Sequence, residues 1–292
     1  MQELREKTPV GTGAASGIGR ALARRLAQEQ MQLVLADIAA QPLAELEREL
    51  RNGDHLCQAV VTDVSLASDV EELARKAQES FGKVHLLVNN AGVSRHTGQA
   101  IWEVPPVDWD WLLGVNFLGV VHGLRAFVPA MLAHGESAHV VNAVSYAGLI
   151  CGGGAYGATK QALISLTESL LFDLRRHGSE IGVTCLCPGL VDTAIVESER
   201  VRPARWKREP ACEPPEWVAY RQNIAEATRR LGVRPEVLAE DILQAIRQNT
   251  FYLLNEPAGS EIGERLSCLQ SGRAPCAPPR PSQSARRLNS SS

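Results

Sequence analysis

Short apolar runs alternate with longer segments of helical periodicity from the N-terminus to about residue 190. The short runs are rich in leucine and β-branched residues and lack strict polar alternation, which is typical of strands covered on both faces. They occupy residues 32–36, 58–61, 85–88, 139–142 and 182–186. Between them, apolar residues recur at helical spacing, as in Leu163, Leu166, Leu170 and Leu174. The pattern predicts an α/β fold, with a doubly wound parallel sheet and helices on both faces.

The pattern changes after Thr193. Residues 197–216 carry many charges and several prolines, which favours a mobile excursion over core structure. A helix over about 235–248 and a strand over 250–254 are expected to close the sheet. From Leu266 onward there is no acidic residue, and arginines stand among prolines and serines. We therefore predict a single domain over 1–265, with a substrate-side excursion over 194–220, and a disordered, solvated basic tail over 266–292.

Composition and charge exclude several classes of protein. The chain has 292 residues, 45% of them hydrophobic, and a formal net charge of -3, so neither nucleic acid nor an acidic membrane surface is an implied partner. No apolar run approaches the roughly 20 residues of a membrane span, and the charged N-terminus does not resemble a secretory signal. The seven cysteines form no Cys-x-x-Cys pair and the histidines show no metal-binding spacing. We expect a cytoplasmic protein without a membrane span or a metal site.

A glycine-rich turn lies between the first expected strand and the first helix. Glycines at 13 and 17 allow tight turning and close backbone approach, and the helix N-terminus offers free N–H groups to a pyrophosphate. Asp37 ends the next strand, 18 positions beyond Gly19, where a carboxylate can bind ribose hydroxyls and would repel a 2′-phosphate. NAD(H) is therefore favoured, while Arg20 beside the turn keeps NADP(H) possible. An ordinary turn is the alternative for the glycines taken alone.

Further motifs follow in a fixed order. They are Asp63-Val64, Asn89-Asn90-Ala91-Gly92, Asn116 within Val115–Gly119, Ser145 within Asn142–Gly148, Tyr156-x-x-x-Lys160, and Pro188-Gly189-Leu190-Val191-Asp192-Thr193. With the glycine turn, they resemble the short-chain dehydrogenase/reductase family over about residues 8–195. The resemblance implies a Rossmann-like fold, a nicotinamide cofactor and, as in many members, a homodimer or homotetramer.

The resemblance also assigns residues to roles. It implies a catalytic set of Asn116, Ser145, Tyr156 and Lys160. It implies cofactor contacts from Thr12, Gly13, Ser16, Gly17, Ile18, Gly19, Asp37, Asp63, Val64, Asn90, Ala91, Gly92, Tyr156, Lys160, Pro188, Gly189, Val191 and Thr193.

The chemistry of the catalytic set can be argued directly. Reducing a ketone by hydride needs a proton donor at the carbonyl oxygen, and the reverse reaction needs a base there. A free phenol titrates near pH 10, and lowering its pKa by roughly 3 units takes about 4 kcal/mol. Lys160, one helical turn after Tyr156, and a positive oxidised nicotinamide would favour the phenolate. Ser145 would steady the developing alkoxide, and Asn116 would hold a water linking Lys160 to solvent. We predict an oxidoreductase that interconverts a small-molecule secondary alcohol and a carbonyl, with Tyr156 as general acid/base.

Two features support a different interpretation. Pro9 and Gly11 are unfavourable in a central strand, and the Ser145–Tyr156 segment is slightly shorter than is usual in the family and carries Gly152–Gly154. A catalytically weak or inactive dinucleotide-binding sensor or scaffold is therefore the alternative. An epimerase or dehydratase on the same fold is less favoured, because those relatives usually have a longer substrate domain. Residues 98–106 and 194–220 are expected to contact the substrate, and nothing in them selects its identity.

Overall fold

Seven parallel strands form the centre of the molecule, in the order β3-β2-β1-β4-β5-β6-β7. The computed structural model describes residues 1–95, 98–208, 214–255 and 259–275. The strands are β1 (Pro9–Thr12), β2 (Leu33–Asp37), β3 (Cys57–Val61), β4 (Leu86–Asn89), β5 (His139–Ala143), β6 (Gly182–Leu186) and β7 (Tyr252–Leu253). The strand order reverses between β1 and β4, which opens a crevice at the carboxyl ends of these strands. The predicted α/β, Rossmann-like fold is confirmed.

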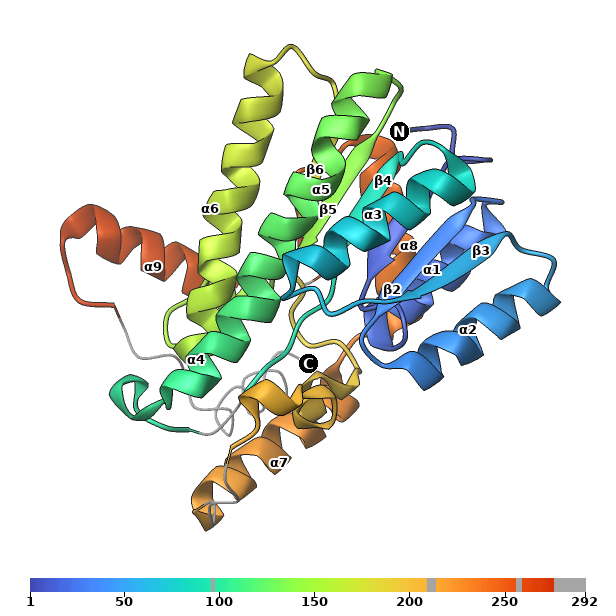
Figure 1. Cartoon of the computed structure of the whole chain (residues 1–292). Helices are drawn as coiled ribbons and strands as arrows, with labels where there is room; N and C mark the ends of the chain where they lie inside the picture. Colours follow the sequence, from blue (N-terminus) through green and yellow to red (C-terminus); the bar gives the residue numbers. More distant parts are fainter. Residues whose placement is uncertain (96–97, 209–213, 256–258, 276–292) are drawn as a thin grey trace.

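Helices cover both faces of the sheet (Figure 1). One face carries α1 (Gly17–Gln28), α2 (Ala40–Asn52) and α8 (Pro235–Gln248), and the other carries α3 (Ala67–Phe81), α4 (Pro106–Leu113), α5 (Gly119–His134) and α6 (Gly154–Arg176). Side chains alternate between the two cores along each strand: Leu33 and Leu35 pack toward α1 and α8, whereas Val34 packs on the opposite side. This double coverage explains the continuous apolar runs in the sequence.

The first strand forms despite its unfavourable residues. Gly11 pairs with Leu35 of β2 and with Val88 of β4. Pro9 is the first residue of the strand, where a missing N–H donor is tolerated. On the α1 side of Gly11 lies a void of about 20 Å³, and a Cβ atom built on Gly11 would meet no heavy atom within 4 Å. The strand is therefore intact, and Gly11 leaves a packing defect beside it.

The chain after Thr193 is more regular than its composition predicts. It forms the 3-10 segments η4 (Ala194–Val201) and η5 (Ala204–Trp206), and then α7 (Pro215–Leu231). The last helix, α9 (Ser260–Ser271), crosses the boundary expected at residue 266, and residues 276–292 of the expected tail lie outside the described residues. Arg265 of α9 donates to the carbonyls of Gly148 and Leu149, so α9 docks beside the start of α6 (Figure 1).

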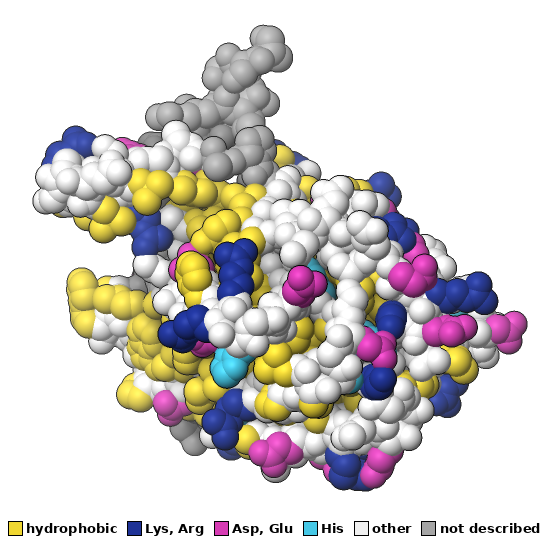
Figure 2. All heavy atoms as spheres, turned by 90° about the horizontal axis from the view of Figure 1, so that it is seen from above, with side chains coloured by type: hydrophobic (Ala, Val, Ile, Leu, Met, Phe, Trp, Pro, Cys, Tyr) yellow, Lys and Arg dark blue, Asp and Glu magenta, His cyan; other side chains and the backbone are white. Residues whose placement is uncertain are grey.

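One helical run differs from the expectation about membrane spans. Within the described parts of the chain, Pro106–His134 is long and apolar enough to cross a membrane by length and composition alone. Its α5 part packs on β4 and α3 within the second core. A core helix of a protein outside the membrane meets the same criterion of length and composition. On the face seen from above, apolar side chains gather mainly toward the left of the view, and basic and acidic side chains are mixed over the rest of the surface (Figure 2).

Candidate active site

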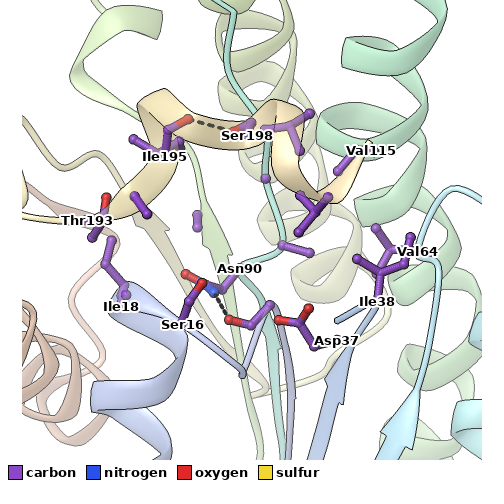
Figure 3. A pocket seen from close by; sticks show the side chains of 18 of the residues that line it. Ser16, Ile18, Asp37, Ile38, Val64, Asn90, Val115, Thr193, Ile195 and Ser198 are labelled. Atoms are coloured by element: carbon purple, nitrogen blue, oxygen red, sulfur yellow. Dashed lines mark hydrogen bonds between the residues drawn. The ribbon is translucent and has the colours of Figure 1, made fainter. Parts of the chain in front are cut away.

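A groove of about 1100 Å³, open solvent at its mouth included, lies at the carboxyl ends of β1, β2, β4 and β5. Figure 3 shows its two walls: Ser16 and Asp37 belong to one, and Ile195 and Ser198 lie across from them. The predicted residues that line the groove are Gly13, Ser16, Gly17, Ile18, Asp37, Asp63, Val64, Asn90, Ala91, Gly92, Tyr156, Lys160, Pro188 and Thr193. Thr12, Gly19, Asn116, Ser145, Gly189 and Val191 are not among the lining residues.

The glycine turn forms a narrow cradle at the N-terminus of α1. Gly13 and Gly17 have φ of +67° and +50°, which side chains rarely adopt. A Cβ on Gly13 would lie 2.8 Å from Asn90 Nδ2, and one on Gly17 would lie 2.9 Å from Thr193 Cγ2. A Cβ on Gly19 would lie 2.1 Å from the carbonyl oxygen of Gly13, so Gly19 permits the helix to approach its own turn. The exposed N–H groups of this turn and helix fit an anionic diphosphate.

The predicted residues outside the groove support its walls. Thr12 Oγ1 accepts hydrogen bonds from the backbone N–H groups of Asn90 and Ala91, at 3.0 and 3.1 Å. The N–H of Gly189 donates to Asn255 Oδ1 at 2.8 Å. Val191 is buried and bridges to Val233. Thr12, Gly189 and Val191 therefore hold the turns that line the groove.

Asp37 lies where a dinucleotide ribose would be recognised. Its Oδ2 accepts from the N–H of Ala15 and its Oδ1 from the N–H of Ala39, both at 2.9 Å. These bonds fix the carboxylate at the groove wall. Arg20, which kept NADP(H) possible, donates to Glu49 at 3.0 Å and does not line the groove. Hydrogen bonds from Arg24 and Arg20 lower the pKa of Glu49 to about 2, so this partner of Arg20 is anionic at neutral pH.

Asp63 has a partner that the sequence did not reveal. Its Oδ2 forms an ion pair with Arg205 Nη2 at 2.6 Å, and its Oδ1 accepts from Ser65 Oγ at 2.5 Å. Arg205 belongs to η5, far along the chain from β3. The charge of Asp63 is therefore balanced at the groove rim.

Tyr156 and Lys160 lie in the first two turns of α6, and both line the groove. Lys160 Nζ donates to the carbonyl of Ala143 at 2.8 Å and lies 5.7 Å from the centroid of the Tyr156 ring. Burial lowers the pKa of Lys160 to about 8. Burial also raises the pKa of Tyr156 to about 12, and a hydrogen bond with Ser145 opposes that rise. The protein surroundings alone thus keep the phenol of Tyr156 protonated at neutral pH.

The short segment between Ser145 and Tyr156 is closely folded. Ser145 Oγ accepts from the N–H of Ala147 at 3.2 Å, as well as bonding to Tyr156. The N–H of Gly157 donates to the carbonyl of Gly153 at 2.7 Å, and a Cβ on Gly153 would lie 2.8 Å from Gly157 Cα. The glycines therefore permit the tight approach that places Ser145 against Tyr156.

Asn116 lies in η2 (Gly114–Leu118), a π-helical turn between α4 and α5. Its Oδ1 accepts from the N–H of Val93 at 2.8 Å, and its Nδ2 donates to the carbonyl of Val93 at 2.9 Å and to Thr159 Oγ1 at 3.1 Å. A Cβ on Gly92 would lie 3.5 Å from Asn116 Oδ1 and 3.4 Å from Lys160 Nζ. The amide side chain thus pins the loop after β4 beside Lys160, and its role toward a bound water stays a prediction.

Several lining residues were absent from the catalytic and cofactor residues that the sequence analysis named. They are Ile38, Thr62, Val93, Trp111, Val115, Ala143, Val144, Ala194, Ile195, Ser198, Arg200, Val201 and Pro203. Many directly follow or flank a quoted motif, so proximity to the ends of strands would have identified them. The lining residues of 194–203 belong to the segment 194–220, for which the sequence predicts contact with the substrate, and they line the same groove as the predicted cofactor residues.

Comparisons with known proteins agree with this geometry. The family model for short chain dehydrogenase matches residues 7–203. The 1-deoxy-11-beta-hydroxypentalenate dehydrogenase of Streptomyces avermitilis is 40% identical over 267 residues, which cover 90% of each chain. A short chain dehydrogenase/reductase from Burkholderia phymatum, solved in complex with NAD, is 41% identical with a TM-score of 0.92, over 96% of this chain and 100% of that one.

A second solved structure bears on the cofactor. The alcohol dehydrogenase of the archaeon Thermococcus sibiricus, complexed with 5-hydroxy-NADP, is 26% identical with a TM-score of 0.68, over 87% of this chain and 99% of that one. Relatives with this fold thus bind either form of the dinucleotide. This chain is a nicotinamide-dinucleotide-dependent oxidoreductase and belongs to the short-chain dehydrogenase/reductase family.

Proposed function

We propose that the protein interconverts a secondary alcohol and a carbonyl, with Tyr156 as the general acid/base. The observation that carries this proposal is the cluster of Tyr156 and Lys160, with Ser145 bonded to Tyr156, in a groove that is also lined by a glycine turn suited to a diphosphate. The bound nicotinamide dinucleotide supplies the hydride chemistry. Tyr156 would donate a proton to the carbonyl oxygen in reduction and accept one from the alcohol in oxidation.

The electrostatics of the cluster fit both directions. A buried phenol with a pKa of about 12 is protonated at neutral pH, so it is ready to donate during reduction. Oxidation needs the phenolate, which the Lys160 ammonium and the positive charge of an oxidised nicotinamide would both favour. The hydroxyl of Ser145, held against Tyr156, would donate a hydrogen bond to the substrate oxygen and stabilise the developing alkoxide.

We infer further that NAD(H) is preferred over NADP(H). Asp37 presents a carboxylate that two backbone N–H groups hold in place. A 2′-phosphate there would meet like charge, and Arg20, which could compensate, is paired with Glu49. Fluorescence titration with NADH and NADPH tests this: we expect NADH to bind at least about tenfold more tightly, and tighter NADPH binding would overturn the preference.

Tyr156→Phe tests the mechanism. Activity would be sought with a panel of secondary alcohols and ketones that includes 1-deoxy-11β-hydroxypentalenate, because the 40% identical relative bears that name. Loss of the acid/base is expected to lower kcat by about 10²–10⁴-fold, with the Kd for NADH within about twofold to threefold of wild type. Tyr252→Phe, on the edge strand β7, is the matched control and should keep full activity. Full turnover by Tyr156→Phe would refute the role of Tyr156.

A further inference from the structure

The segment 194–206, which contains η4 and η5, forms one wall of the groove. It contributes six lining residues, Ala194, Ile195, Ser198, Arg200, Val201 and Pro203. Figure 3 shows Ile195 and Ser198 of this segment across the groove from Ser16, at the glycine turn, and from Asp37. The segment therefore faces the dinucleotide half of the site, although its position in the sequence suggested contact with the substrate.

Buried polar contacts fasten the first part of this segment to the body of the protein. Ser94 Oγ donates to the carbonyl of Ile195 at 2.8 Å, and the N–H of Ser94 donates to Ser198 Oγ at 3.1 Å. Arg202 Nη2 pairs with Asp108 Oδ1 of α4 at 2.5 Å, and both side chains are almost fully buried. The wall is thus preformed by contacts with the loop after β4 and with α4.

A second set of contacts fastens the far end. Arg205 pairs with Asp63 after β3 at 2.6 Å, and its guanidinium lies 4.1 Å from the centroid of the Trp206 ring. Trp206 packs against Gly114 so closely that a Cβ on Gly114 would lie 2.8 Å from the indole. The segment is therefore held on both sides of Arg200.

Arg200 stands between these anchors with an uncommitted positive charge. Its Nη1 donates to the carbonyls of Ala194 and Glu197, at 2.9 and 3.1 Å, which orients the guanidinium. Its Nη2 reaches across to Ser16 Oγ at 3.5 Å. Ser16 is the N-cap residue of α1, yet its hydroxyl makes no capping bond. Within the described residues, Arg200 forms no ion pair with a carboxylate.

We propose that Arg200 binds the diphosphate of the dinucleotide from the wall opposite the glycine turn. The inference deepens the proposed function, because it requires the dinucleotide to occupy this groove. A dinucleotide diphosphate carries two negative charges, and the planar guanidinium donates paired hydrogen bonds that match phosphate oxygens. The turn supplies neutral N–H donors and a helix dipole on one side, and Arg200 supplies the full charge on the other. Because the wall is already anchored, little ordering would be required when the ligand binds.

Arg200→Gln tests the proposal by ligand dissection. Kd values would be measured for NADH, for ADP-ribose, which keeps the diphosphate, and for adenosine, which has no phosphate. We expect NADH and ADP-ribose to bind about tenfold more weakly or worse, as for loss of a hydrogen bond to a charged group, and adenosine to bind as in wild type. Wild-type affinity for NADH should also fall more steeply with added KCl than the affinity of the variant does.

Arg175→Gln is the matched control, since it removes the same charge from an exposed position near the far end of α6. It should leave all three Kd values unchanged. Wild-type NADH affinity in Arg200→Gln would overturn the proposal alone. An equal loss for adenosine would also overturn it, because Arg200 would then only shape the wall. A wild-type protein that binds neither NADH nor ADP-ribose would overturn the proposed function and this inference with it.

Discussion

Gly11→Ala is expected to stabilise the protein, although it changes a residue in the central strand. Gly11 lies beside a void of about 20 Å³ whose lining includes Leu22, Leu26 and Leu35. A Cβ there meets nothing within 4 Å, and Gly11 is not among the glycines with positive φ. Restricting the unfolded chain contributes about 0.4–1 kcal/mol, and burying one methyl group adds about 0.8 kcal/mol. We expect the free energy of unfolding to rise by about 1–2 kcal/mol in total.

Urea unfolding followed by circular dichroism measures this change, and Tm should rise by roughly 2–6 °C. Gly82→Ala is the matched control: a Cβ on Gly82 also meets nothing within 4 Å, but φ is +76° at the C-terminus of α3. That variant is expected to lose about 1 kcal/mol, because its backbone conformation disfavours a side chain. Destabilisation by Gly11→Ala would refute the assignment of the void as a packing defect. Equal behaviour of the two variants would refute the reasoning from φ.

Three further predictions concern charge. His139 is fully buried, and burial lowers its pKa to about 3. Because the unfolded chain binds more protons than the folded protein below pH 6.5, the free energy of unfolding should fall by about 3 kcal/mol between pH 6.5 and pH 4. His139→Gln should flatten this pH dependence. Asp108→Asn removes the carboxylate that pairs with both Arg95 and Arg202. The free energy of unfolding in urea should fall by about 3–5 kcal/mol, and NADH should bind more weakly. Unchanged stability would contradict this prediction. Lys160→Met removes a charge that favours the phenolate of Tyr156, so the apparent pKa of alcohol oxidation should rise by about one unit or more. Identical pH profiles for the variant and the wild type would count against this role of Lys160.

The strands and α8 could be predicted because local periodicity determines them. The run 182–186 and the helix 235–248 occur where the apolar pattern placed them. The cradle could also be predicted, since its glycines and Asp37 stand close together in the sequence and meet within one βαβ unit.

The wall formed by residues 194–206 could not be predicted in the same way. Its charges and prolines resemble those of a solvated loop, but the charges are the groups that fasten it. Arg205 meets Asp63 across 142 positions of sequence, and Arg202 meets Asp108 across 94. A local pattern does not record such pairs. The start of β1 shows the opposite case, in which the local sequence predicted less order than the structure has. Pro9 and Gly11 predicted a weakened strand, but β2 and β4 pair with β1 on both sides and hold it in register.

The π-helical turn at η2 makes the position of Asn116 depend on chain length as well as on residue type. Such a turn contains one residue more than an α-helical turn. Deleting a residue from 114–118 would restore regular α-helical winding and remove the wide turn that contains Asn116. Asn116 would then lose its place opposite Val93. When relatives are aligned, a gap in this turn is therefore as informative as a substitution of the asparagine itself.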